Sequence, residues 1–89
     1  MSTEAEQRSR KAVETDLLAF LEERTRLSWK SDTDLFESGD VTSMFALELV
    51  LHIEDTYGIA VEGADLQLDN FRTVDAMAAL ILRLGSSPA

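Results

Sequence analysis

The chain has 89 residues, of which 45% are hydrophobic, and it has no cysteine. A chain of this length forms one small domain with a single modest core, so we expect one domain over residues 1–89, without a deep active site and without enzymatic activity. Eight Lys and Arg against 17 Asp and Glu give a formal net charge of −9, which disfavours binding to nucleic acid or anionic lipid and favours partners with basic patches.

Nothing in the sequence indicates a membrane or an exported protein. The first residues contain no basic leader followed by an apolar run, and no segment approaches the length that spans a bilayer. The lack of cysteine excludes disulfides and thiolate metal ligands, so stability must come from packing. The sequence therefore predicts a soluble, cytoplasmic monomer.

An amphipathic helix is predicted from about residue 4 or 5 to about residue 24. One buried stripe follows the helical period and ends in a charge: Val13, Leu17, Phe20, Leu21 and Arg24. A long loop over residues 27–40 follows, rich in turn formers. Loops of this length are often either functional or disordered. We expect this one to be ordered, with Leu27, Leu35 and Phe36 pinning it to the core.

The second helix is predicted over residues 43–57. Gly58 follows it and fits the glycine that commonly ends a helix in a left-handed conformation. Residues 64–70 are expected to form a short helical turn, with Leu66 and Phe71 reaching inward. No segment of the chain reads as a convincing strand.

The last predicted helix begins after Thr73, a good N-cap, and continues to about residue 84. Residues 85–89 are expected to form a loose tail, which leaves an ordered core over about residues 5–84. The predicted fold is all-α: a small four-helix bundle with three main helices plus one short helix, and a long loop between the first and second helices.

Two apolar stripes run along the second helix when its residues are placed at about 100° each. The stripe predicted to face the core consists of Ala46, Leu49, Val50, Ile53 and Tyr57. The second stripe and the acids that frame it are Met44, Leu47 and Leu51 with Glu48, Glu54 and Asp55. A helix in so small a bundle usually buries one stripe, so we expect the second to be partly exposed and to bind a partner with a basic rim. The alternative is a central helix that contacts neighbours on both sides.

Ser43 stands at the head of the second stripe. A serine at the start of a helix is usually an N-cap, but Thr42 can fill that role and leave the hydroxyl of Ser43 free. The positive end of the helix dipole favours a phosphate there. The single histidine, His52, lies about 180° away on the helical wheel and is expected to face solvent. No base therefore activates Ser43, so we expect another enzyme to modify it, and a hydrolase is disfavoured.

A calcium site is the metal alternative. Asp32, Asp34 and Asp40 resemble the start of an EF-hand loop, but Glu37 and Ser43 stand where that loop needs Gly and Glu. We expect no metal site.

The segments 34–39, 42–44, 48–50, 53–55 and 57–59 together resemble the acyl carrier proteins and the related peptidyl carriers. In that family the serine of an Asp-Ser-Leu or similar motif receives 4′-phosphopantetheine from coenzyme A through a phosphopantetheinyl transferase. The resemblance covers roughly residues 13–84 and implies a four-helix fold with the prosthetic group on Ser43. It also matches the second stripe and its acids to the family's partner-recognition helix. Thr42 departs from the Asp that the family most often has, which keeps the cap but removes a carboxylate.

The resemblance implies a carrier that holds an acyl group as a thioester on this arm. Its partners would be the transferase, an acyl-loading enzyme and a downstream synthase or acyltransferase. Segments 38–39, 43–50 and 68–76 also resemble stand-alone carriers of polyketide pathways, which handle glyceryl-derived or methoxymalonyl-type units. The alternative is a small acidic helical adaptor that binds a basic partner without a prosthetic group.

Overall fold

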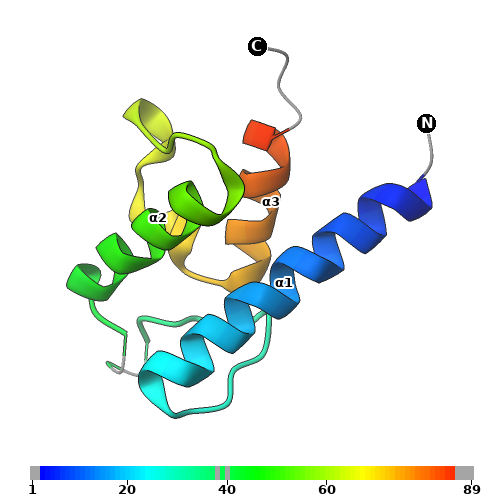
Figure 1. Cartoon of the computed structure of the whole chain (residues 1–89). Helices are drawn as coiled ribbons and strands as arrows, with labels where there is room; N and C mark the ends of the chain where they lie inside the picture. Colours follow the sequence, from blue (N-terminus) through cyan, green and yellow to red (C-terminus); the bar gives the residue numbers. More distant parts are fainter. Residues whose placement is uncertain (1–2, 38, 40, 86–89) are drawn as a thin grey trace.

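The computed structural model describes residues 3–37, 39 and 41–85, with side chains from residue 10 onward. Every regular element in this part of the chain is helical (Figure 1). The elements are α1 (Thr3–Thr25), α2 (Ser43–Tyr57), η1 (Gly63–Asp65), η2 (Leu68–Phe71) and α3 (Val74–Gly85), where η denotes a 3-10 helix. The all-α prediction is confirmed, but two 3-10 turns stand where one short fourth helix was expected. Gly85, predicted as the first residue of the tail, is instead the last residue of α3, and residues 86–89 of the predicted tail lie outside the described residues.

Helices α1 and α3 pack most closely against each other, and α2 lies alongside them (Figure 1). The N-terminal turns of α1 project beyond the other helices in that view. The chain between α2 and α3 returns through η1 and η2, and η2 contacts both helices. We call residues 58–73, which include η1 and η2, the return segment. The return segment packs against α2 through η2.

The core takes side chains from all three α-helices, from the α1–α2 loop and from η2. Its fully buried large side chains are Leu17, Leu21, Leu35, Val41, Leu49, Ile53, Phe71, Val74, Met77 and Leu80. Burial of that many apolar side chains, at about 1.5–3 kcal/mol each, is the main term that holds so small a domain together.

The stripe predicted on α1 is only partly correct. Val13, Leu17 and Leu21 are buried, but Phe20 is half-buried and Arg24 is exposed. Phe20 packs against the core from a partly buried position and stacks on Phe45 and His52 of α2. The buried face of α1 is therefore narrower than predicted, because one edge of it faces the exposed side of α2.

The α1–α2 loop has one of the predicted anchors in the core. Leu35 is fully buried, and its N–H donates to the carbonyl of Arg72 at 2.8 Å. Phe36 packs against the core from a partly buried position, whereas Leu27 is 42% exposed, so its predicted role as an anchor is wrong. The chain turns sharply at Arg26, whose φ is 63°, and this turn carries Leu27 away from the core. Val41, which the pattern did not single out, is buried instead.

In the return segment before α3, one of the two side chains predicted to reach inward is buried and the other is exposed. Phe71 is buried as expected, but Leu66 is 51% exposed. The N–H of Leu66 closes the η1 turn on the carbonyl of Gly63 at 3.1 Å, and Leu66 then lines a surface hollow next to α2. The inward role predicted for Leu66 is therefore wrong.

Candidate functional site

Thr42 and Gly58 set the two ends of α2, as the sequence predicts. Thr42 is extended, and its hydroxyl accepts a hydrogen bond from the N–H of Phe45 at 3.3 Å. Gly58 has φ 64° and donates its N–H to the carbonyl of Glu54 at 3.0 Å. Thr42 thus does the capping, and Ser43 is the exposed first residue of α2.

A hollow of about 150 Å³ opens beside Ser43, between α2 and the return segment. Ser43, Ala46 and Leu47 line it from α2, and Leu66, Leu68 and Phe71 line it from the other side. Its walls are mostly apolar. The sequence did not predict this hollow, because its two walls come from segments about 20 residues apart.

The two stripes of α2 differ sharply in exposure. In the core stripe, Leu49 and Ile53 are fully buried. In the second stripe, Met44, Leu47 and Leu51 are 78%, 59% and 65% exposed. The predicted exposure of the second stripe is therefore confirmed. We call Met44, Leu47 and Leu51 the apolar strip.

The three acids that frame the apolar strip lie in different surroundings. Glu48 forms an ion pair with Arg24 of α1, at 2.9 Å between Oε1 and Nη1. Asp55 is exposed. Glu54 is half-buried, and its carboxylate accepts a hydrogen bond from the N–H of Val61 at 2.8 Å. Glu54 therefore has a structural role in addition to its place among the acids that frame the apolar strip.

His52 does not face solvent, which corrects the prediction. Its side chain is only 20% exposed, and Nε2 lies 3.0 Å from Oδ2 of Asp16. The ring stacks on Phe20, with 4.1 Å between the ring centroids. A helical wheel of α2 alone gives no sign that α1 covers this side. His52 thus links α2 to α1, on the opposite face of the helix from Ser43.

Asp16 also holds Tyr57 at the end of α2. The hydroxyl of Tyr57 donates to Oδ2 of Asp16 at 2.9 Å. Burial, together with the hydrogen bond and the negative charge of Asp16, raises the pKa of Tyr57 above its ordinary value. The tyrosine is therefore a neutral hydrogen-bond donor over the physiological pH range.

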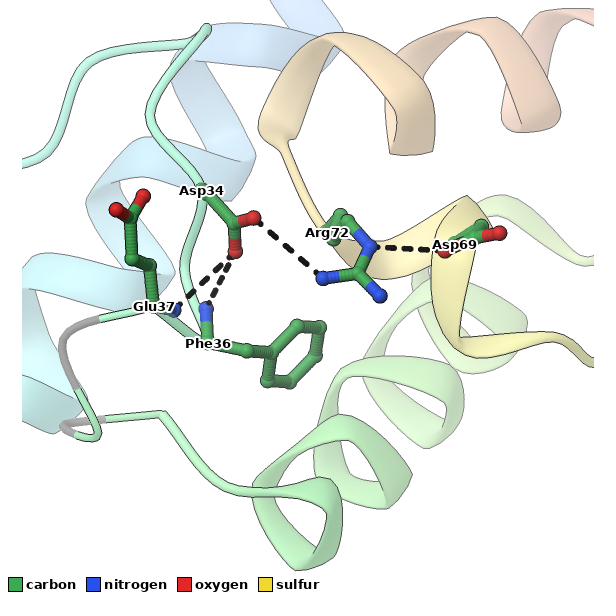
Figure 2. Close-up of polar contacts among 5 residues, drawn as sticks. All are labelled: Asp34, Phe36, Glu37, Asp69 and Arg72. Atoms are coloured by element: carbon green, nitrogen blue, oxygen red, sulfur yellow. Dashed lines mark hydrogen bonds and ion pairs between the residues drawn. The ribbon is translucent and has the colours of Figure 1, made fainter.

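Asp34 organises the loop that leads toward Ser43 (Figure 2). Its Oδ1 accepts hydrogen bonds from the N–H groups of Phe36 and Glu37 at 3.0 and 3.2 Å. Its Oδ2 pairs with Nη1 of Arg72 at 3.4 Å, and Nε of Arg72 pairs with Asp69 at 2.8 Å. This chain of contacts ties the loop to η2, which also lines the hollow beside Ser43.

The contacts of Asp34, part of the segment that resembles the start of a calcium loop, give it a structural role. Its carboxylate closes a turn and pairs with an arginine. Among the described residues, no three His, Asp or Glu side chains gather as metal ligands would, and Asp40 lies outside those residues. In the same part of the chain, no helix has both the length and the apolar character to cross a bilayer.

Comparison with known proteins places this arrangement in a family. No curated protein and no solved structure matches the chain. The model of the family described as "Phosphopantetheine attachment site" matches residues 15–81, a stretch that contains Ser43, all of α2 and both walls of the hollow. The chain belongs to this phosphopantetheine attachment site family and is a carrier protein for covalently attached 4′-phosphopantetheine.

Proposed function

We propose that this chain is an acyl carrier protein, not itself an enzyme, and that its 4′-phosphopantetheine arm is attached to the hydroxyl of Ser43. The observation that carries this proposal is that Thr42 and Ser43 have different roles at the start of α2. Thr42 provides the cap, so the exposed hydroxyl of Ser43 is available at the positive end of the helix dipole. A phosphate ester is favoured at that position.

His52, the single histidine of the chain, is not placed to act as a base for the modification of Ser43. His52 lies on the opposite face of α2 and is engaged with Asp16 and Phe20. A transferase must therefore remove the proton of the Ser43 hydroxyl while its oxygen bonds to the phosphorus next to the pantetheine of coenzyme A. The pyrophosphate bond of coenzyme A then breaks, and adenosine 3′,5′-bisphosphate leaves. When attached, the arm supplies the thiol that this cysteine-free chain lacks, and an acyl group is held there as a thioester.

The hollow beside Ser43 fits the base of such an arm or a short group carried on it. Its apolar lining suits carbon-rich parts of a ligand, and its volume of about 150 Å³ is below the range of about 300–1,000 Å³ that is typical of small-molecule pockets. Together with the resemblance of segments 38–39, 43–50 and 68–76, this leads us to propose a stand-alone carrier of a polyketide pathway. The cargo would be a short unit of the glyceryl or methoxymalonyl type.

The partners proposed for this carrier are a phosphopantetheinyl transferase, an acyl-loading enzyme and a downstream synthase or acyltransferase. Each would dock on the apolar strip and its acids, Glu48, Glu54 and Asp55. The exposure of the strip next to Ser43 supports this role, because an interface needs an apolar centre with a charged rim. A docked enzyme would meet the tethered acyl group at a raised effective concentration.

Intact-mass measurement tests the attachment site. The purified protein is incubated with coenzyme A, Mg²⁺ and a broad-specificity phosphopantetheinyl transferase, and we expect one phosphopantetheine adduct. Ser43→Ala should give no adduct, whereas Ser28→Ala, which removes another exposed hydroxyl, should be modified normally. An unmodified wild-type chain with several transferases would contradict the proposal and support the acidic adaptor, which the family match does not favour.

A further inference from the structure

A second hollow, of about 360 Å³, lies where α1 passes the exposed side of α2. It borders the apolar strip at Leu51 and does not include Ser43. Its walls are Phe20, Arg24, Glu48, Leu51, His52 and Asp55. The surface next to the apolar strip is therefore made by two helices, and α1 contributes a cation to it.

Two independent contacts hold Arg24 at the edge of this hollow. Its guanidinium pairs with Glu48 at 2.9 Å, and the guanidinium carbon lies 4.9 Å from the ring centroid of Phe20. Phe20 is itself fixed by stacking on His52 and on Phe45, at centroid distances of 4.1 and 6.1 Å. The arginine thus lies over a stacked aromatic side chain and beside Glu48, one of the acids that frame the apolar strip.

The ion pair between Arg24 and Glu48 is open to competition. The two side chains are 50% and 51% exposed, and exposed ion pairs contribute little to stability because solvent screens them. A basic side chain from a partner can therefore replace Arg24 on Glu48 at small cost. The guanidinium can turn away from Glu48 while it stays near Phe20, because the face of the ring attracts it independently of the ion pair.

We propose that Arg24 sets partner specificity by competing for Glu48. In the free chain Arg24 neutralises this acid, and a partner enzyme docks by placing its own arginine or lysine on Glu48. The occupant of the second hollow is that basic side chain, which is attracted by the carboxylates of Glu48 and Asp55 and by the net charge of −9. Arg24 lowers the affinity of every such partner and selects those with a well-placed base. This inference rests on the proposed function, because it concerns the enzymes that act on Ser43.

The test measures loading of Ser43 by the transferase at low salt. Arg24→Gln should raise kcat/KM about two- to fivefold through a lower KM, the size expected when an exposed ion pair is removed. Lys11→Gln is the matched control, because it makes the same change in net charge at an exposed site on α1, about 20 Å away along the helix. Glu48→Gln should lower kcat/KM, and the double variant should behave like Glu48→Gln alone. High salt should remove the difference between Arg24→Gln and wild type.

Three outcomes overturn the role of Arg24. These are an Arg24→Gln variant that behaves like Lys11→Gln, one that is loaded more slowly than wild type, and a gain that persists when Glu48 is also replaced. Each requires that the wild-type chain is loaded, so they are distinct from a failure of the proposed function, in which the wild-type chain acquires no adduct.

Discussion

The carboxylate of Glu54 accepts a hydrogen bond from the backbone N–H of Val61 at 2.8 Å, and this contact fastens the chain after α2 to the side of that helix. The side chain of Val61 is buried. Glu54 therefore combines a place among the predicted partner-binding acids with a structural role. Asp55, the next residue, is exposed.

Replacement of Glu54 should therefore lower the stability of the fold, whereas replacement of Asp55 should not. We expect Glu54→Ala to lower the free energy of unfolding by about 1 to 2 kcal/mol, because the buried N–H of Val61 loses its acceptor. Asp55→Ala should stay within about 0.5 kcal/mol of wild type. Urea unfolding measures both, and equal stability of the two variants would contradict the assignment of Glu54.

The contribution of Thr42 to stability should come from its side-chain oxygen, which caps α2. We expect Thr42→Ala to cost about 0.5 to 2 kcal/mol, because the N–H of Phe45 loses its cap, whereas Thr42→Asp and Thr42→Ser keep an oxygen at the same position. The control is Thr15→Ala, at an exposed position inside α1, which should be neutral or slightly stabilising because alanine is the better helix former. Thermal unfolding ranks the four variants. A Thr42→Ala variant as stable as wild type would mean that the cap makes no contribution.

Substitutions on the two faces of α2 should have different effects, one on stability and the other on the binding of partner enzymes. Ile53 is fully buried, so we expect Ile53→Ala to lower the free energy of unfolding by about 2 to 5 kcal/mol. Leu51 is 65% exposed, so Leu51→Ala should change stability by less than about 0.5 kcal/mol while raising the KM for loading of Ser43. Urea unfolding and transferase kinetics on both proteins give the comparison, and the reverse pattern would mean that the two stripes are assigned to the wrong faces.

Tyr57 should resist ionisation in the folded protein. It is the only tyrosine, so the absorbance of tyrosinate reports on it alone, and we expect its titration midpoint well above the ordinary value of 10.0. Because the folded state holds this proton more tightly than the unfolded state, its contribution to stability is complete below pH 10 and falls as the pH rises toward the raised pKa. Stability should therefore fall less steeply above pH 10 in Tyr57→Phe, and identical slopes would contradict the link to Asp16.

Local chemistry and periodicity predicted α2 well. Its bounds follow from Thr42 and Gly58, whose preferences at helix ends act within one or two residues along the chain. The exposure of the apolar strip could also be predicted, because a small bundle offers one buried side to each helix. The exposed hydroxyl of Ser43 followed from the same reasoning.

What the sequence could not predict depends on which distant segment passes nearby. His52 and Phe20 contact each other because α1 crosses that side of α2, a geometry that no single helix encodes. Leu27 and Leu66 are apolar residues that turns direct outward, and Val41 is a lone apolar residue in a polar loop. The contact between Asp34 and Arg72 joins residues 38 positions apart.

The backbone packing of the three α-helices has a consequence for local opening. Helices α1 and α3 make the most extensive backbone contacts with each other, whereas α2 makes fewer, with η2 and α3. Amide hydrogens in α2 should therefore exchange with solvent through smaller fluctuations than those in the centres of α1 and α3, which need more of the domain to open. We therefore expect the helix that carries the proposed docking surface to move more readily than the α1–α3 pair, which would let one short helix adapt to several different enzymes.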